Sequence, residues 1–240
     1  RNLDHTTLEK ETSLIRKGIF DIKSDVYSTI GVPFVRISNL KNCSIDTSDI
    51  IYIPENENLN YIETFLSKGD IIISKTANAA ASIVDIDNCN TSQDTVAIKL
   101  KSTSKLNSYY TVIFLNSKFG LKQMQRWFTG NIQMHLNLTV CKEKLLIPVF
   151  TTKFQLRINK LFELSLEKKK FASRKYLQAE TILLESLGLK DFSPSSEPVN
   201  IKSFKESFGA SGRLDAEYYQ MKYEQMMTHI QKQDHSLLKD

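Results

Sequence analysis

Polar side chains that can recognise nucleic-acid bases alternate with apolar ones in the second half of this 240-residue sequence. The polar members of this alternation are Asn131, Gln133, His135 and Asn137. A spacing of two residues puts side chains on the same face of an extended strand. Asn and Gln amides can form paired hydrogen bonds with adenine. The pattern predicts a base-reading loop, and the alternative interpretation is an amphipathic edge strand without a ligand.

Two earlier apolar segments, Pro33–Leu40 and Gly69–Thr76, also end in polar turns. Lysine and hydroxyl groups suit contact with phosphates, while arginine and amide groups can also reach base edges. The alternative is that each turn simply closes an ordinary core strand. The candidate contact residues in and after these segments are Arg36, Ser38, Asn39, Lys75, Thr76 and Asn78.

The positive charge of the chain is concentrated in one stretch. The formal net charge is +5, and residues 99–144 hold eight basic residues against the single acid Glu143. Such a segment predicts an anionic partner such as DNA, although a solvated face is the plain alternative. The basic candidates nearest the alternating segment are Lys118, Lys122 and Arg126.

Enzyme signatures are missing from the sequence. It contains no GxGxxG, GxxxxGK[ST] or GxSxG pattern. Asp85 and Asp87 share a strand face but have no matching third ligand, and the four histidines lack metal-binding spacing. We therefore expect no catalytic residues, no metal and no cofactor. Three unpaired cysteines, without any CxxC, predict a cytoplasmic protein with reduced thiols, and no apolar run is long enough for a membrane.

Residues 1–150 are predicted to form one mixed α/β (α+β) domain. Helical spacing over Asn107–Phe128 indicates one or two helices with a break near Ser117–Gly120, and Leu145–Val149 resembles a final strand. Ile- and Val-rich runs bounded by turn residues predict strands. These runs are Gly18–Ile22, Phe34–Ile37, Ile50–Ile53, Ile71–Ile73, Ser82–Ile86 and Thr95–Leu100.

Residues 151–190 are predicted to be a long helix, because 153–187 contain neither Pro nor Gly and Gly188 follows as a C-cap. Its heptad-like seam from Ile158 to Leu183 suits antiparallel coiled-coil pairing with another helix. Residues 191–212 are predicted to be a linker, and 213–240 the helical start of a second half.

Several motifs together resemble the specificity (S) subunit of type I restriction-modification enzymes. They occur in the family's order: PFVRISNL, GDIIISKT, TGNIQMHLNL leading into LLIPV, and the long helix ending ILLESLGL. GASGRLDAEYYQMKYE at residues 209–224 is similar to the opening of the family's second half. The resemblance covers one target-recognition domain, the spacer helix and the start of another half.

The resemblance implies a non-catalytic, sequence-specific DNA-binding subunit. It would recognise half of a bipartite DNA target, while paired long helices fix the spacing between the two halves. The implied partners are double-stranded DNA, an adenine methyltransferase subunit that itself binds S-adenosylmethionine, a restriction motor subunit, and a second copy through the long helix. The same module also occurs fused to methyltransferases.

An alternative function is a protein–protein adaptor, in which the α/β domain binds a polypeptide and the helix dimerises. The adaptor predicts that Lys122→Glu and Arg126→Glu abolish a protein partner and leave DNA binding unchanged.

Overall fold

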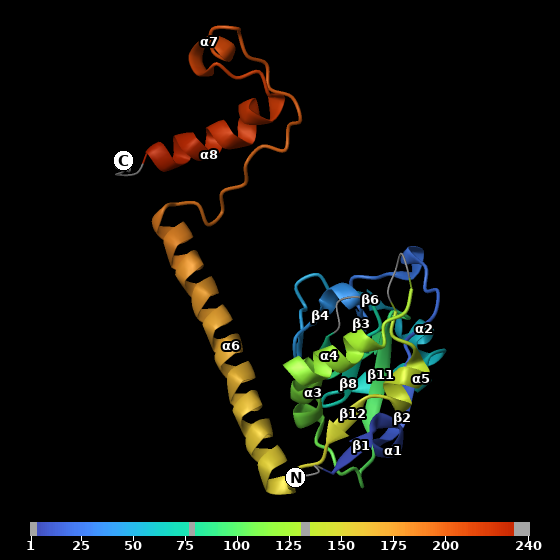
Figure 1. Cartoon of the computed structure of the whole chain (residues 1–240). Helices are drawn as coiled ribbons and strands as arrows, with labels where there is room; N and C mark the ends of the chain where they lie inside the picture. Colours follow the sequence, from blue (N-terminus) through green and yellow to red (C-terminus); the bar gives the residue numbers. More distant parts are fainter. Residues whose placement is uncertain (1–3, 77–79, 131–134, 233–240) are drawn as a thin grey trace. The chain divides into compact units, whose positions relative to one another are not determined.

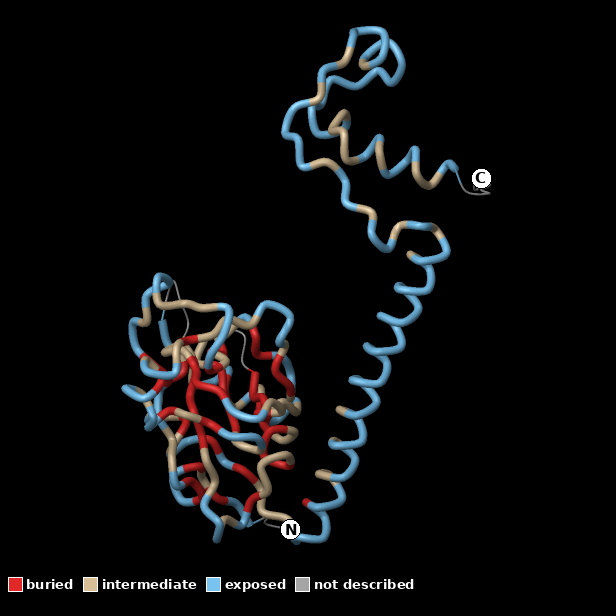
Figure 2. The backbone as a smooth tube through the Cα atoms, turned by 180° about the vertical axis from the view of Figure 1, so that it is seen from behind, coloured by how far each residue is buried: buried red, intermediate tan, exposed pale blue. Residues whose placement is uncertain are grey.

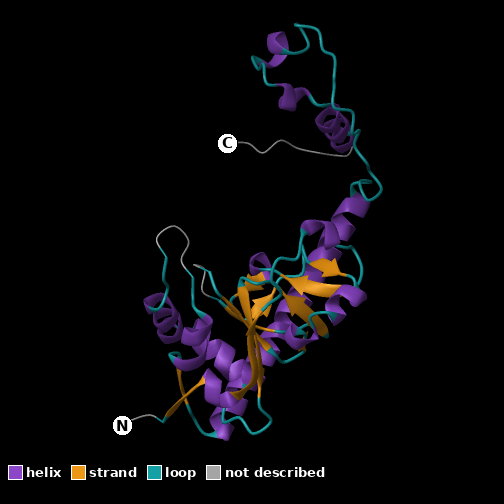
Figure 3. Cartoon of the chain, turned by 90° about the vertical axis from the view of Figure 1, so that its right-hand side faces the viewer, coloured by secondary structure: helices purple, strands orange, loops and turns teal. Residues whose placement is uncertain are grey.

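The computed structural model describes residues 4–76, 80–130 and 135–232. The chain divides into two compact units, residues 1–165 and residues 166–240. Figure 3 shows that the strands belong to the first unit, whereas the described part of the second contains helices and loops. The mixed α+β domain followed by a long helix, α6 (Thr152–Ser186), agrees with the predicted fold class. The predicted domain boundaries stay a prediction.

The first unit contains two four-stranded sheets and two strand pairs (Figure 1). One sheet has the order β6-β3-β10-β7, the other β2-β11-β8-β9, and the pairs are β1-β12 and β4-β5. Only the β10–β3 ladder is parallel among these named pairs. The strands are β1 (His5–Thr7), β2 (Thr12–Lys17), β3 (Val32–Val35), β4 (Leu40–Lys41), β5 (Ser44–Ile45), β6 (Ile51–Ile53), β7 (Leu66–Ser67), β8 (Ile71–Ser74), β9 (Ala81–Ile83), β10 (Asn88–Thr91), β11 (Thr95–Leu100) and β12 (Leu146–Pro148).

Short helices connect and cover these sheets. The helices of the first unit before α6 are α1 (Leu8–Glu11), α2 (Glu55–Leu59), α3 (Ser108–Asn116), α4 (Lys118–Arg126) and α5 (Leu138–Glu143), with 3-10 turns η1 (Ser24–Val26), η2 (Ile37–Asn39) and η3 (Ile62–Thr64). The predicted break between two helices lies at Ser117, whose hydroxyl caps α4 by accepting from the Gly120 N–H. A Cβ on Gly120 would lie 2.3 Å from the Phe114 carbonyl oxygen, so only glycine permits this sharp junction.

Figure 2 shows that the buried residues of the first unit lie in its interior, and one apolar cluster joins residues of both four-stranded sheets. Ile71, Ile72 and Ile73 of β8 are fully buried, as expected for a strand covered on both faces. Ile72 packs in one apolar cluster with Val35, Leu66 and Ala97. This interior places the ends of β3, β8 and β10 so that the loops following them carry the polar candidates.

One strand prediction is wrong, and the strand β10 was not predicted. The predicted strand over 18–22 is absent, because the strand is β2 and the chain leaves the sheet at Gly18, where any Cβ would meet the Thr91 and Ser92 carbonyls at 2.3 Å. No local pattern predicts β10, because its residues are polar yet mostly buried. Its Asn90 amide donates to Asn58 and to the Tyr61 carbonyl, which satisfies polar groups that would otherwise prevent burial.

The second unit contains the remainder of α6, α7 (Phe208–Ser211), the 3-10 turn η4 (Ala216–Tyr219) and α8 (Met221–Gln231). Gly188 ends α6 with a φ of 64°, and the Leu189 N–H donates to the Leu184 carbonyl, as predicted for a glycine C-cap. Helical structure resumes earlier than predicted, because α7 lies inside the segment 191–212 that was predicted to be a linker. Between α7 and η4, the Arg213 side chain donates two 2.7 Å hydrogen bonds to the Asp215 carboxylate.

Candidate nucleic-acid interface

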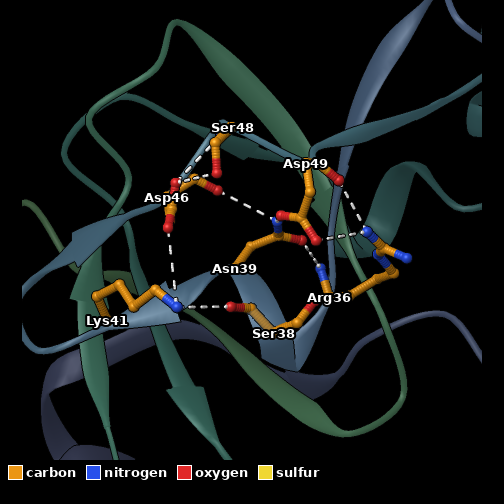
Figure 4. A network of polar contacts seen from close by, with 7 residues as sticks. All are labelled: Arg36, Ser38, Asn39, Lys41, Asp46, Ser48 and Asp49. Carbon is orange, nitrogen blue, oxygen red and sulfur yellow. Dashed lines mark hydrogen bonds and ion pairs between the residues drawn. The ribbon is translucent and has the colours of Figure 1, made fainter. Parts of the chain in front are cut away.

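Arg36 is positioned by a polar network that holds the turn after β3 (Figure 4). Its Nη2 donates to the Asp49 carbonyl oxygen at 2.8 Å and to the Asp49 carboxylate at 3.3 Å. Its backbone N–H donates to the Asn39 side chain at 2.9 Å. The Arg36 side chain remains 32% exposed, although its Nε is buried and has no hydrogen-bond partner among the described residues. The guanidinium is therefore held in place while part of it stays accessible.

Asn39 lies inside this network and is fully buried. Its amide nitrogen donates to the Asp49 carboxylate at 2.7 Å and to the Asp46 carbonyl at 3.1 Å. Both ends of the amide are thus committed to the turn, and the predicted direct contact of Asn39 with DNA does not fit this burial. Asn39 positions the turn, while the neighbouring Ser38 is exposed.

The turn Ser92–Asp94, between β10 and β11, lies next to Arg36 and Ser38. A cavity of about 300 Å³ lies between this turn and the Arg36 turn, lined by Arg36, Ser38, Gln93 and Asp94, with Asp21 and Tyr27 also at its wall. Sequence reasoning did not select Asp21, Gln93 or Asp94, because no motif marks them and only the tertiary fold brings them to this cavity.

Lys75 contacts the same turn. Its Nζ donates to the Gln93 carbonyl at 3.0 Å, and its backbone N–H donates to the Asp94 carbonyl at 2.8 Å. Burial, followed by the nearby Lys17, lowers the pKa of the Lys75 ammonium, although Asp94 and Cys141 oppose the change. Lys17 is exposed at the end of β2, so two cations lie close together here. An anion such as phosphate would relieve their repulsion.

The third predicted segment meets the second beside Lys75. The Leu136 N–H donates to the Lys75 carbonyl at 2.7 Å, and His135 forms β-bridges with both Thr76 and Thr129. We use the name loop cluster for Arg36–Asn39, Lys75–Thr76, Ser92–Asp94 and His135–Leu136. Three predicted segments that are far apart in the sequence therefore meet in one place, together with the Ser92–Asp94 turn. The candidates Asn78, Asn131 and Gln133 lie outside the described residues.

Asn137 does not continue an extended strand. It is the N-cap of α5, and its side-chain oxygen accepts from the Thr139 N–H at 2.9 Å. The predicted alternation therefore ends before Asn137, because the chain turns into a helix there. The cap explains the asparagine without any ligand.

The basic candidates Lys118, Lys122 and Arg126 are exposed on α4, whereas Gly120 and Met124 are buried. The three cations follow a spacing of four residues and so share one helix face. Arg126 also lies over the Trp127 ring, 5.7 Å from its centroid. The helix leads directly to Thr129, which contacts His135 of the loop cluster.

Two other lysines of the basic segment form an ion pair or a hydrogen bond within the domain. Lys99 pairs with Asp70 at 3.5 Å, and Lys101 donates to the Lys10 carbonyl at 2.7 Å. The positive charge available for an anionic partner is consequently smaller than the count over 99–144 indicates, and α4 carries much of it.

The described residues contain no group of three or more His, Cys, Asp or Glu that could hold a metal ion. Burial raises the pKa of the Cys89 and Cys141 thiols to about 12, so neither forms a thiolate near neutral pH. Within the same part of the chain, no helix is both long and apolar enough to cross a membrane.

Comparisons with known proteins place this architecture in one class. No family model matches the sequence, and no curated protein matches it. A chain from a structure of the type I restriction-modification system, described for its complex assembly and conformational transition, matches with a TM-score of 0.50 and 18% identity. The match covers 77% of this chain and 43% of that chain. The predicted resemblance to type I restriction-modification S subunits is thus confirmed at the level of the fold.

Two further solved structures are similar. The S subunit of the type I restriction-modification system from M. genitalium has a TM-score of 0.49 and 13% identity, over 75% of this chain and 44% of that chain. The HsdS subunit from Thermoanaerobacter tengcongensis has a TM-score of 0.44 and 16% identity, over 78% of this chain and 42% of that chain. The chain therefore spans less than half the length of the solved structures that it matches.

Proposed function

We propose that this chain is a sequence-specific DNA-recognition module of a type I restriction-modification specificity subunit. The observation that carries the proposal is the loop cluster. In a domain with this fold, Arg36 and Lys75 lie at the Ser92–Asp94 turn, and the His135–Leu136 segment contacts Lys75 and Thr76. Arg36 would read a base edge, because an arginine held at one side can present its remaining N–H groups in a fixed direction. Ser38, Thr76 and His135 would add polar contacts.

Phosphate contacts in this proposal come from α4 and from Lys75 with Lys17. Such contacts release counterions, so binding weakens as salt rises. The module itself needs no cofactor, because methyl transfer from S-adenosylmethionine would occur in the partner methyltransferase. The setting of such a complex is the cytoplasm, where cellular DNA and reduced thiols are found.

The exposed apolar residues of α6 support a second part of the proposal. Tyr176, Leu177 and Ile182 are between 59% and 72% exposed, and such side chains favour a protein partner. We assign this helix to pairing with another long helix, either in a second half or in a second copy, and to recruitment of the methyltransferase and restriction motor subunits. The same exposure also favours the adaptor alternative, which needs a protein partner but no DNA.

Methylation mapping tests the proposal most directly. Cells that carry the chain in its natural complex should methylate adenines in one bipartite sequence, and exchange of the loop-cluster residues should change one half-site only. Purified protein should bind duplexes containing that half-site in a salt-dependent way. Salt-insensitive binding, or methylation that is unaffected by every loop-cluster variant, would contradict the proposal and favour the adaptor.

A further inference from the structure

Gln155 is an unusual residue at the base of α6. It lies in the first turn of the helix but is only 3% exposed, whereas its neighbours Phe154 and Leu156 are 42% and 53% exposed. A buried glutamine amide is costly unless its polar atoms are satisfied. Its burial in an otherwise exposed helix therefore indicates a specific contact with the domain.

The Gln155 amide reaches three separate backbone groups. Its Oε1 accepts from the Asn107 N–H at 2.8 Å, and its Nε2 donates to the carbonyls of Lys105 at 2.8 Å and Phe150 at 2.9 Å. Lys105 and Asn107 belong to the turn between β11 and α3, while Phe150 belongs to the segment that enters α6. One side chain thus joins the helix, the segment before it and a turn of the domain.

The turn that Gln155 contacts is itself fixed. The Lys105 N–H and the Ser104 hydroxyl donate to the buried Glu11 carboxylate at 2.7 and 2.8 Å. The Asn107 side chain caps α3 by accepting from the N–H groups of Tyr109 and Tyr110. Gln155 therefore forms hydrogen bonds with a turn whose own position is fixed by further hydrogen bonds within the domain.

Aromatic contacts between α6 and the domain continue along the helix beyond Gln155. Phe154 lies 4.8 Å from Phe150 and 6.5 Å from Tyr110 between ring centroids. Two turns beyond Gln155, the Phe162 ring meets Tyr109 edge to face at 5.7 Å. Aromatic packing allows sliding and tilting, whereas three directed hydrogen bonds specify one orientation.

We infer that Gln155 is a positioning residue that fixes the orientation of the recognition domain on the base of α6. For the second readout below, the inference rests on the proposed function: domain orientation would then set how strictly a complete specificity subunit selects the spacing between its two half-sites. Gln155 would not touch DNA, and the bases of each half-site would be read as before.

The first test measures orientation without DNA. Spin labels carried by non-natural amino acids at the exposed Thr29 and Ser165 report the distance between the domain and the base of the helix in the full chain. Gln155→Met keeps a similar side-chain volume but removes all three hydrogen bonds. We expect its distance distribution to broaden while the circular dichroism spectrum stays unchanged. Gln178→Met, an equivalent change at an exposed position of α6, should leave the distribution narrow.

The second test uses the complete methyltransferase complex and targets whose spacer is lengthened or shortened by one base pair. We expect Gln155→Met to reduce the preference for the natural spacer by about tenfold, equal to ~1.4 kcal/mol, with an unchanged preference for each half-site. The preference is a ratio between two spacer lengths measured on the same protein sample, so it does not depend on the fraction of protein that is folded.

Two outcomes would overturn the inference. An unchanged distance distribution in folded Gln155→Met would show that aromatic packing alone sets the orientation. Global unfolding of Gln155→Met would show that the residue belongs to the core and has no separate orienting role. If the unsubstituted complex methylates no bipartite target, the proposed function fails, but the spin-label distances still decide the role of Gln155.

Discussion

Arg36 and Asp49 are joined at two points, since Nη2 of the arginine donates to both the backbone carbonyl and the carboxylate of the aspartate. The Asp49 side chain is 60% exposed, so the ion pair contributes little to stability. Its effect is geometric, because it leaves the guanidinium one orientation at the edge of the cavity.

Replacing Arg36 with lysine should therefore affect recognition more than charge. Lys cannot reproduce the planar fork of Arg, so we expect affinity for the cognate half-site to fall by about tenfold and non-specific affinity to change little. Titration of cognate and scrambled duplexes measures the two affinities. The exposed Arg16, which pairs with Glu63, provides the matched control Arg16→Lys. An equal loss on both duplexes would mean that Arg36 contacts only phosphate.

Charge reversal on α4 should reduce the salt dependence of DNA binding. If Lys118 and Lys122 each neutralise one phosphate, the double variant to Glu should lower the slope of log K against log salt by about 2. Lys10→Glu with Lys153→Glu is the control of equal charge, because both residues are exposed and lie on α1 and α6 rather than on α4. The same slope in both double variants would rule out α4 as the phosphate-binding helix.

Glu11 should make the domain sensitive to acid. Burial would raise the pKa of its carboxyl group, but hydrogen bonds from Ser104, Thr6 and the Lys105 N–H outweigh burial and lower the pKa below its ordinary value of 4.5. The carboxylate therefore stabilises the fold above about pH 4.5, and this stabilisation is lost as the pH falls through the folded-state pKa.

Urea unfolding of Glu11→Gln checks this dependence. We expect the variant to be about 1–3 kcal/mol less stable at pH 7, with a smaller difference from the unsubstituted protein in acid. Glu9→Gln, at an exposed position of the same helix, should behave like the unsubstituted protein. A difference that stays constant with pH would contradict a role for the carboxylate charge.

Asn137 should stabilise the domain because it is the N-cap of α5. We expect Asn137→Ala to lower the free energy of unfolding by about 1 kcal/mol, while Asn137→Ser retains a capping oxygen and most of the stability. Thermal unfolding compares the two. If the serine variant is as unstable as the alanine variant, the cap is not the reason for the asparagine.

The sequence predicted elements whose local pattern agrees with their final environment. The strand Thr95–Leu100, the helix break near Ser117 and the end of α6 at Gly188 follow from apolar runs, capping residues and glycine. β10 could not be recognised because its burial depends on partners such as Asn58, which is 32 residues away from Asn90.

The candidate site was predictable in parts but not as a whole. Each polar turn has a local signature, but their meeting in the loop cluster depends on long-range sheet pairing that spacing does not reveal. Asn137 carried a readable signal, since asparagine before Leu138–Glu143 is a favoured N-cap, but the period-two alternation favoured a strand instead.

The pairing of β1 with β12 has a consequence for synthesis on the ribosome. Thr6 aligns with Ile147, so β1 finds its partner only after some 140 further residues have been translated. At about 5–20 residues per second, that interval is on the order of ten seconds. During this time the edge of β1 is unpaired, and it is a site where chaperones or neighbouring nascent chains can bind.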